Sequence, residues 1–440
     1  MKTDALIEHL SQFHPKGYDL SLGRISGLLA KLGNPQDKLP PTFHVAGTNG
    51  KGSVVANLRA ILEANGHSVH AHTSPHLVNY HERYRIGHDK GGSTTKGELV
   101  SDDMLAEALG RVADANDGAK ITVFELLAAT MFVLFSEQPA DYAIVEVGLG
   151  GRFDGTNVIN KPEVSIITTI SLDHQTHLGD TIAAIAFEKA GIIKAGCPVV
   201  IGEQKDDARE VLENIALEKN CPMMIARQDF DYYQEAGRFI YQDTDGLLDL
   251  PLPALGGEHQ LANSATAIAA LRLANCQIKE AAFEQAMGEL YWPGRFEQLP
   301  PGIITSLVGG AGEVWIDGGH NVGAGEVIAK ELENRNCLVS KDLVLICAML
   351  TTKNPQQYFA QFAALNPKIY TVPITTSEHG IAPQALAEYA QAAGLEALAC
   401  QNLDDALASV AEIKGDYRLL IAGSLYLVGE VLKKNGTTLK

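Results

Sequence analysis

The most constraining feature of the sequence is a glycine-rich loop that joins an apolar run to a segment of helical periodicity. Residues 43–46 are strand-like, and residues 54–63 carry apolar side chains at helical spacing. The loop between them contains Gly47, Thr48, Asn49, Gly50, Lys51, Gly52 and Ser53. Glycines allow backbone N–H groups to converge on phosphate oxygens, a lysine adds positive charge, and a hydroxyl at a helix start can bind Mg²⁺. The segment therefore predicts a strand, a phosphate-binding loop and a helix, with a nucleoside triphosphate as ligand.

The spacing of this loop departs from the general phosphate-loop motif G-x-x-x-x-G-K-[ST]. Only two residues separate Gly47 from Gly50, and Gly52 intervenes before Ser53. The alternative is a plain glycine-rich turn. Such a turn would have no use for a lysine and a hydroxyl together, so we favour the phosphate-binding interpretation.

Length and charge narrow the classes of protein to which the chain can belong. Its 440 residues exceed what one hydrophobic core usually serves, so we expect two domains. A formal net charge of −18 disfavours a nucleic-acid or anionic-membrane surface, because both partners require a basic field. No apolar run approaches the roughly twenty residues of a membrane-spanning helix. Six cysteines without a Cys-x-x-Cys spacing suit a reducing compartment, so we expect a soluble, cytoplasmic protein. We also expect it to be a monomer.

Apolar, β-branched runs alternate with helical periodicity along two stretches of the chain. The runs are residues 69–72, 142–147, 164–170 and 198–201 in the first stretch, and 314–317, 343–348, 369–372 and 418–422 in the second. Such runs are typical of a parallel sheet that is buried on both faces. Prolines and glycines cluster between the two stretches. We therefore predict an α/β protein: a doubly wound, mostly parallel sheet in a nucleotide-binding domain, residues 1–296, and a smaller Rossmann-like α/β domain, residues 297–440.

Two ionisable side chains follow neighbouring strands of the predicted nucleotide-binding domain. Glu146 is the one carboxylate inside the run 142–147, and we interpret it as a Mg²⁺ ligand in preference to half of a structural ion pair. His174 follows the next strand and is either a second metal ligand or an ordinary surface or core histidine. A zinc site among the six histidines of residues 67–88 is disfavoured, because no cysteine lies at short spacing from them.

Other polar positions carry both a structural and a functional interpretation. Lys189 lies in an apolar helical segment, where it either extends its ammonium to water or meets a counter-charge. Asn263 opens an alanine-rich helix and is either a helix-start residue or a ligand contact. Asp317 and His320 place an acid and an imidazole in one tight turn after the first strand of the second domain. Ser74 places a hydroxyl at the end of a strand beside the phosphate-binding loop.

Taken together, these segments resemble the folate branch of the Mur ligase superfamily, the dihydrofolate synthases and folylpolyglutamate synthases. The segments that carry the resemblance are residues 47–53, 73–77, 146–154, 172–174, 188–192, 293–295 and 317–321. The phosphate loop of this branch is similar in having a second glycine after the lysine, so Gly52 is part of the resemblance. One departure is Gly319, where the family usually has alanine.

The resemblance implies ATP and Mg²⁺ as cofactors, with two metal sites. Ser53 and Glu146 would bind one ion, and Ser74 and His174 would organise the second. Lys189 would be carbamylated, which converts a buried cation into an anion that supports the metal site.

The resemblance also implies contacts to the nucleotide and to the pterin substrate. Asn263 would meet the adenine, Arg295 the phosphates, and Asp317 and His320 the nucleotide from the second domain. The pterin end of the substrate would lie near Phe124, Arg152 and Asp154.

The implied reaction is ATP-dependent amide formation between L-glutamate and dihydropteroate or a reduced folate, through an acyl phosphate. Lys51, Lys189 and His174 would be the catalytic residues, with Lys51 stabilising charge on the transferred phosphoryl group. We favour the bifunctional bacterial form. The alternatives are a monofunctional folylpolyglutamate synthase, another amino-acid ligase of the superfamily, and a nucleotide-dependent regulatory switch.

Overall fold

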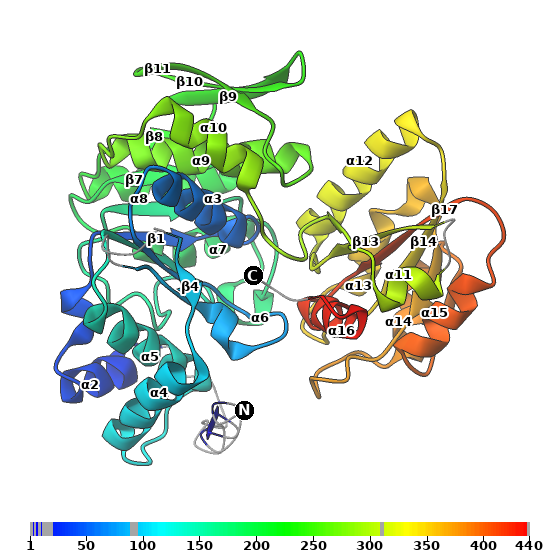
Figure 1. Ribbon diagram of the computed structural model, residues 1–440, viewed down its shortest axis with the longest axis horizontal. Helices are drawn as coiled ribbons and strands as arrows, with labels where there is room; N and C mark the ends of the chain where they lie inside the picture. The colour runs from blue at the N-terminus through cyan, green and yellow to red at the C-terminus, as the bar shows by residue number, and fades with distance from the viewer. Residues whose placement is uncertain are drawn as a thin grey trace. The chain divides into compact units, whose positions relative to one another are not determined.

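The computed structural model describes residues 21–88, 96–308 and 312–437, together with Thr3, Leu6, Ile7 and Leu10. It consists of two compact units (Figure 1). The first comprises Met1–Ile170, Leu178–Ala254 and Gln260–Tyr291, and the second comprises Ser171–His177, Leu255–His259 and Trp292–Lys440. The predicted boundary between residues 296 and 297 stays a prediction. None of the helices in these described ranges is long and apolar enough to cross a membrane.

The first unit contains a mostly parallel sheet with strand order β4-β3-β2-β5-β1-β6-β7-β8. Its strands are β1 (Thr42–Ala46), β2 (Val69–His72), β3 (Tyr84–Ile86), β4 (Glu98–Leu99), β5 (Tyr142–Glu146), β6 (Val164–Ile167), β7 (Val199–Ile201) and β8 (Met223–Ile225). Along this order the six strands β2, β5, β1, β6, β7 and β8 are parallel to one another. At one edge, β3 pairs antiparallel with β2, and β4 pairs antiparallel with β3. The parallel neighbours β5 and β6 flank β1, so the loop that follows β1 leaves the middle of the sheet at its carboxyl edge.

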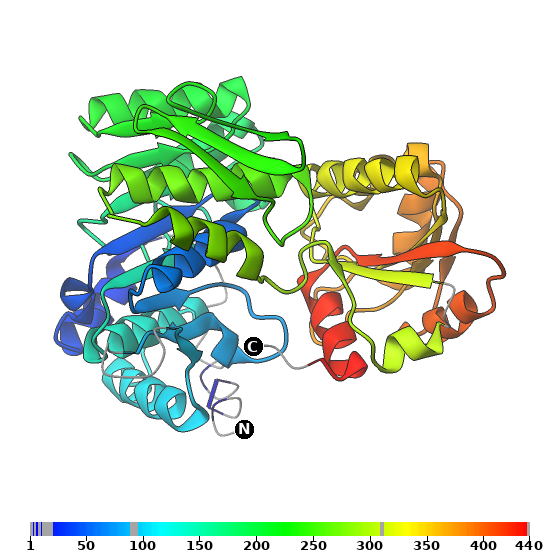
Figure 2. The same cartoon turned by 45° about the horizontal axis from the view of Figure 1, so that its top comes forward.

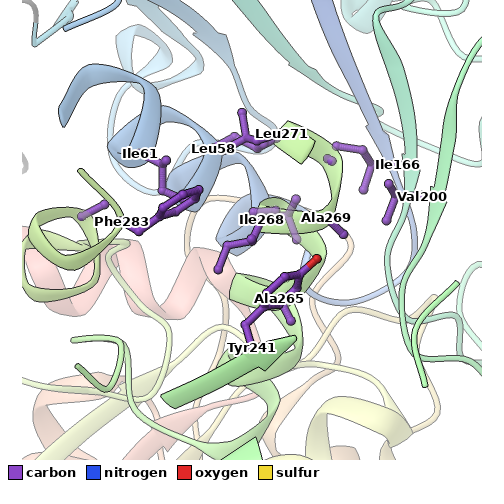
Figure 3. Packing of buried hydrophobic residues seen from close by; sticks show 14 of the residues in the cluster. Leu58, Ile61, Ile166, Val200, Tyr241, Ala265, Ile268, Ala269, Leu271 and Phe283 are labelled. Carbon is purple, nitrogen blue, oxygen red and sulfur yellow. The ribbon is translucent and has the colours of Figure 1, made fainter. Parts of the chain in front are cut away.

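Helices cover both faces of this sheet. They are α2 (Gly23–Lys31), α3 (Lys51–Ala64), α4 (Asp102–Asn116), α5 (Val123–Glu137), α7 (Ile182–Lys189), α8 (Asp206–Glu218), α9 (Glu258–Leu273) and α10 (Glu280–Glu289). Successive side chains of β5 alternate between two apolar clusters: Ile144 packs in the cluster that includes α3 and α9, whereas Ala143 and Val145 pack in the cluster that includes α2, α4 and α5. Figure 3 shows Leu58 of α3 close to Leu271 of α9 in the first cluster. The doubly covered sheet explains why its strands lack polar alternation.

Two features of the first unit depart from the sequence prediction. The run predicted at 164–170 is wrong in its last three residues, because β6 ends at Ile167 and the backbone beyond it turns to bond the phosphate-binding loop. A three-stranded antiparallel sheet was not predicted at all. It comprises β9 (Phe230–Glu235), β10 (Arg238–Asp243) and β11 (Gly246–Pro251), and its inner side chains join the cluster around α9 and α10.

The second unit contains a six-stranded sheet with order β12-β13-β17-β14-β15-β16, parallel except for β12. Its strands are β12 (Glu297–Gln298), β13 (Gly312–Asp317), β14 (Asp342–Cys347), β15 (Lys368–Thr371), β16 (Ala397–Ala399) and β17 (Tyr417–Ala422). Its helices are α11 (Ile303–Leu307), α12 (Val322–Leu338), α13 (Pro355–Ala360), α14 (Pro383–Ala392), α15 (Leu403–Ala411) and α16 (Leu425–Asn435). Figure 2 shows α12 and α16 on opposite sides of this sheet. Short helices elsewhere are α6 (Gln175–Leu178), η1 (Pro35–Lys38), η2 (Tyr80–Arg83), η3 (Ala190–Ile192) and η4 (Ala363–Leu365).

Candidate functional site

The predicted phosphate-binding loop lies between β1 and α3, and close approach of other segments requires its glycines. Gly47 and Gly50 have positive φ, 147° and 88°, which favours glycine. A Cβ on Gly47 would lie 1.8 Å from Oγ1 of Thr168, and one on Gly50 would lie 2.3 Å from Oδ1 of Asn263. The loop is thus a narrow cradle that side chains at these two positions would fill.

Backbone bonds hold this loop against the chain that follows β6. The N–H groups of Thr48 and Asn49 both donate to the carbonyl of Thr169, at 3.0 and 3.1 Å. Their donors are therefore engaged. The N–H groups at the start of α3, from Lys51 to Ser53, have no acceptor within the helix and are the donors that the loop offers to a phosphate.

Two lysines from different elements converge on one carbonyl of the loop. Nζ of Lys51 donates to the carbonyls of Gly47 and Thr48, both at 3.1 Å, and Nζ of Lys189 donates to the Gly47 carbonyl at 2.8 Å. Lys189 ends α7 and only 4% of it is exposed. Two positive charges on the same carbonyl oxygen favour an anion beside them. Ser53, at 2% exposure, lies in the first turn of α3.

The carboxylate predicted as a metal ligand lies at the end of β5. Glu146 is 4% exposed, and its Oε2 accepts the backbone N–H of Ser74 at 3.2 Å. The structure therefore brings Glu146 and Ser74 together. Carboxylate and hydroxyl oxygens are the donors that Mg²⁺ prefers, so these residue types fit the predicted ion.

The described ranges contain no group of three or more His, Cys, Asp or Glu side chains that could hold a metal ion. The histidines of the segment 67–88 instead have protein partners. His70 contacts the carbonyl of Gln138 at 3.0 Å, and His72 contacts the carbonyl of Arg83 at 2.9 Å. Burial lowers the pKa of His72 to about 3, so it is neutral at physiological pH.

Asn263 lies on α9, beside the phosphate-binding loop. Its Nδ2 donates to Oε1 of Gln260 at 3.0 Å, which fixes the direction of its amide. The side chain is 6% exposed. The structure thus brings Asn263 close to Gly50, as a nucleotide-contacting residue would require.

The loop after β5 contains the residues predicted to meet the pterin. A Cβ on Gly148 would lie 2.3 Å from the ring of Phe124, so loop and ring are in close contact. Arg152 pairs with Glu188 at 3.3 Å and has its guanidinium 4.4 Å from the ring centre of Phe153. With 43% of its side chain exposed, Arg152 remains accessible to a ligand.

Asp154 is fully engaged within this loop. Its carboxylate accepts the N–H of Leu149 at 2.8 Å, the N–H of Thr156 at 2.9 Å and the Thr156 hydroxyl at 2.6 Å. The same hydroxyl lies 2.9 Å from Nε2 of His44 on β1. Burial raises the pKa of Asp154, which these hydrogen bonds partly oppose. Its described contacts therefore organise the loop, and they link it to the strand that carries the phosphate cradle.

A buried lysine that the sequence analysis missed pairs with the residue before His174. Nζ of Lys353 lies 2.6 Å from Oδ1 of Asp173 and 3.4 Å from Nε2 of His174. Asn321 donates to Oδ2 of Asp173 at 3.1 Å, and His320 lies 3.7 Å from that oxygen. Burial alone would raise the pKa of Asp173, but the bond to His320 and the neighbouring charges hold it far below its usual range. Lys353 lies in the segment after β14, and no signal in its local sequence marks it as buried.

The turn after β13 brings Asp317, Arg295 and His320 together. Asp317 accepts the N–H of Phe296 at 2.7 Å and the N–H of Gly319 at 2.5 Å. Nη1 of Arg295 donates to the carbonyl of Gly294 at 3.1 Å, and Nδ1 of His320 bonds the carbonyl of Gly318 at 2.8 Å. Burial raises the pKa of Asp317. Asp317 thus joins the turn to the segment that carries Arg295.

Family models and known proteins match this chain over most of its length. Residues 45–271 match the Mur ligase middle domain, and residues 303–434 match the dihydrofolate synthetase C-terminal domain. The chain is 34% identical to a folylpolyglutamate synthase of Lacticaseibacillus casei, covering 93% of this chain and 92% of that protein. It is 30% identical to a dihydrofolate synthase/folylpolyglutamate synthase of Escherichia coli, covering 97% and 94%.

Solved structures agree with these matches. E. coli FolC in complex with DHPP and ADP has a TM-score of 0.85 and 28% identity, covering 98% of this chain and 97% of that one. A bifunctional folylpolyglutamate synthase/dihydrofolate synthase with Mn, AMPPNP and L-glutamate bound has a TM-score of 0.82 and 27% identity, covering 95% and 94%. The α/β fold class predicted from the sequence is confirmed.

Proposed function

The chain belongs to the dihydrofolate synthase/folylpolyglutamate synthase family of Mur ligases, and we propose that it adds L-glutamate both to dihydropteroate and to reduced folylglutamates. Membership in this family confirms the resemblance found in the sequence and makes the chain an ATP-dependent ligase. The single observation that carries the proposed chemistry is the convergence of Lys51 and Lys189 on the glycine cradle at the start of α3.

We propose that the cradle binds the ATP phosphates. The N–H groups at the start of α3 would donate to phosphate oxygens, and Lys51 would leave the Gly47 carbonyl to meet the γ-phosphate. An oxygen of the substrate carboxylate attacks the γ-phosphorus and ADP leaves, which yields an acyl phosphate. The amine of L-glutamate then attacks the acyl carbon, loses a proton and expels inorganic phosphate. Water must be excluded, because it would hydrolyse the acyl phosphate.

We propose two Mg²⁺ sites. Ser53 and Glu146 would hold one ion, and Ser74 and His174 the second. Support comes from the bond between the Ser74 amide and Glu146, and from a solved relative described with Mn, AMPPNP and L-glutamate bound. When bound, the ions would neutralise charge on the phosphates.

Lys189 is proposed to be carbamylated. As an ammonium it competes with Lys51 for the Gly47 carbonyl, whereas a carbamate at the same position would be an anion able to support the metal site. The amine nitrogen of Lys189 attacks carbon dioxide and releases one proton. Its burial at 4% exposure would protect the product from water.

The remaining site residues complete the proposed ligand contacts. Asn263 would meet the adenine, Arg295 the phosphates, and Asp317 and His320 the nucleotide from residues 297–440, which we propose as the glutamate-ligase domain. Phe124 and Arg152 would contact the pterin end of the substrate, and Asp154 would hold that loop in place.

The proposed reaction is tested by incubating the protein with Mg-ATP, L-glutamate and either dihydropteroate or tetrahydrofolate. Phosphate release and the mass of new product are followed together. We expect one glutamyl unit to be added to each acceptor, and Lys51→Ala to abolish both products. Lys31→Ala is the control, because Lys31 is on the surface of α2 and bonds only the carbonyl of Ala115 among its described contacts.

Two of the alternatives have their own outcome in this assay. Product from tetrahydrofolate alone would indicate a monofunctional folylpolyglutamate synthase. Slow ATP hydrolysis that is indifferent to both acceptors and to glutamate would indicate a nucleotide-dependent switch and would refute the proposal.

The carbamate is tested by supplying ¹³C-labelled bicarbonate and recording the carbonyl region of the ¹³C NMR spectrum. We expect a carbamate signal in the wild type and none in Lys189→Ala. Ligase activity of Lys189→Ala should be lost and partly restored by a short carboxylate such as acetate. A variant that keeps full activity without rescue would contradict the carbamate.

A further inference from the structure

Two cysteines lie next to each other where β7 and β8 begin. These parallel strands pair with Val199 opposite Met223. Counting back two residues on each strand places Cys197 opposite Cys221. Neighbouring strands run about 4.8 Å apart, which lies within the Cα separation that a disulfide tolerates.

Hydrogen bonds hold the two segments in this register before the strands begin. The N–H of Gly196 donates to the carbonyl of Lys219 at 2.9 Å, and the N–H of Val199 donates to the carbonyl of Pro222 at 2.8 Å. The two cysteines lie between these bonds. Their backbones are therefore held on both sides at the spacing of paired strands.

Both cysteines also bond the same oxygen atom. The N–H of Cys197 donates to the carbonyl of Lys194 at 3.0 Å, and the thiol of Cys221 donates to that carbonyl at 3.2 Å. The Cys221 sulfur is thus directed at the turn that carries Cys197. Both thiols are free, with Cys197 partly exposed and Cys221 buried.

Charged side chains of both signs lie near the pair: Lys161 and Lys194 favour a thiolate at Cys197, whereas the carboxylate of Glu163 opposes it. Nζ of Lys219 donates to the carbonyl of Ile193 at 2.5 Å, and Lys194 leads the turn itself. Burial raises the pKa of both Cys197 and Cys221. Lys161 and Lys194 partly oppose the rise at Cys197, and the backbone of Gly196 and the ammonium of Lys219 partly oppose it at Cys221. Cationic neighbours stabilise a thiolate, which is the species that attacks a disulfide.

We propose that Cys197 and Cys221 form a redox-active dithiol that closes to an internal disulfide when it meets a low-molecular-weight disulfide. The partly exposed Cys197 thiolate attacks one sulfur of the oxidant, forms a mixed disulfide and releases a thiolate. The Cys221 thiolate then attacks the Cys197 sulfur and releases the second thiolate. The two cysteine protons pass to the released thiols, two electrons reduce the oxidant, and one new S–S bond joins the starts of β7 and β8. The proposal does not depend on the proposed ligase reaction.

The test treats the folded, full-length protein with oxidised glutathione, blocks the remaining thiols and maps the peptides by mass spectrometry. We expect a linked pair of peptides containing Cys197 and Cys221, a loss of about 2 Da from the intact mass, and full reversal by dithiothreitol. The same treatment in urea should close this bond at least about ten-fold more slowly, because only the fold holds the thiols together.

Variants separate this geometry from general thiol reactivity. Cys221→Ser should retain a glutathione adduct on Cys197 without further reaction, whereas Cys337→Ser, which removes an exposed thiol on α12, should leave the link unchanged. Persistence of both thiols in the wild type while Cys337 is oxidised would overturn the proposal. Equal closure rates in the folded and unfolded chain would also overturn it.

Discussion

The sharpest prediction concerns Gly50→Ala, because the chain offers a closely matched control at the other end of the same helix. Gly50 precedes α3 with a φ of 88°, and Gly66 follows α3 with a φ of 89°. A Cβ on Gly66 meets nothing within 4 Å, whereas one on Gly50 would lie 2.3 Å from Oδ1 of Asn263. The two substitutions therefore share the backbone strain and differ in the clash.

The expected magnitudes follow from these contacts. Left-handed backbone costs an alanine about 1–2 kcal/mol, so Gly66→Ala should lower the free energy of unfolding by about that amount. Gly50→Ala carries the same strain and also forces Asn263 away from Gln260, to which it is bonded at 3.0 Å. Losing that bond costs about 1 kcal/mol, so the total for Gly50→Ala should be about 2–3 kcal/mol.

The functional effect should separate the two variants further. Displacement of Asn263 and of the first amides of α3 should raise the KM for ATP at least about ten-fold in Gly50→Ala, equivalent to about 1.4 kcal/mol. Gly66→Ala should leave it unchanged. The double variant Gly50→Ala/Asn263→Ala should be about as unstable as Gly50→Ala alone, because Asn263 has already lost its bond to Gln260 in the single variant.

Urea unfolding supplies the stabilities, and steady-state kinetics with varied ATP supplies KM. Equal stability losses in the two single variants, together with an unchanged KM for ATP in Gly50→Ala, would exclude the clash between position 50 and Asn263 as the cause.

Three further substitutions and one control substitution test the electrostatics of the fold. Lys353→Met should lower the free energy of unfolding by about 3–5 kcal/mol, because it removes the lysine that pairs with the buried carboxylate of Asp173. The control Lys330→Met removes an exposed ion pair and should cost less than about 1 kcal/mol. Urea unfolding midpoints compare the two variants. Burial lowers the pKa of His44 to about 3, whereas the same imidazole has a pKa of about 6.5 in the unfolded chain. The contribution of neutral His44 to stability is therefore complete above pH 6.5 and is lost as the pH falls toward 3. His44→Gln should flatten the fall in stability between pH 6.5 and pH 4; an unchanged slope in urea titrations would exclude this cause. Burial would raise the pKa of Glu313, but its bonds to Lys341 and Arg418 outweigh burial and lower that pKa to about 2. The ionised Glu313 therefore stabilises the fold above an unfolded pKa of about 4.5, and this contribution is lost as pH falls toward 2. Glu313→Gln should therefore be less stable than the wild type at pH 6, by about 1–2 kcal/mol after allowance for its partial exposure, and nearly equal to it at pH 2, as paired denaturant titrations would show.

Much of the fold could be predicted because buried parallel strands leave a strong local signal. The apolar runs at 69–72, 142–147 and 343–348 correspond to strands β2, β5 and β14, whose ends lie within one residue of the predicted ends. The sheet of β9, β10 and β11 was missed because one face of it is exposed, so apolar and polar side chains alternate. In β9, Phe230 and Tyr232 are buried, whereas Tyr233 is exposed.

The candidate site divides in the same way. The glycine-lysine loop and the strand-end residue Glu146 were recognisable because their chemistry is local to one turn. Lys353 was missed because its role depends on a partner, Asp173, that is 180 positions away in the chain. A lone lysine has no signal in sequence that distinguishes a buried ion pair from an exposed side chain.

The sequence by itself determined the glycine-lysine loop between a strand and a helix, the α/β class and the family, because these depend on residue types at short fixed spacings along the chain. Only the tertiary structure decided which distant groups meet. It brings Lys189 to the Gly47 carbonyl, Asn263 to Gly50 and Cys221 to the Lys194 carbonyl. The physical reason is that strand order and register set these contacts, and neither can be read from a linear pattern.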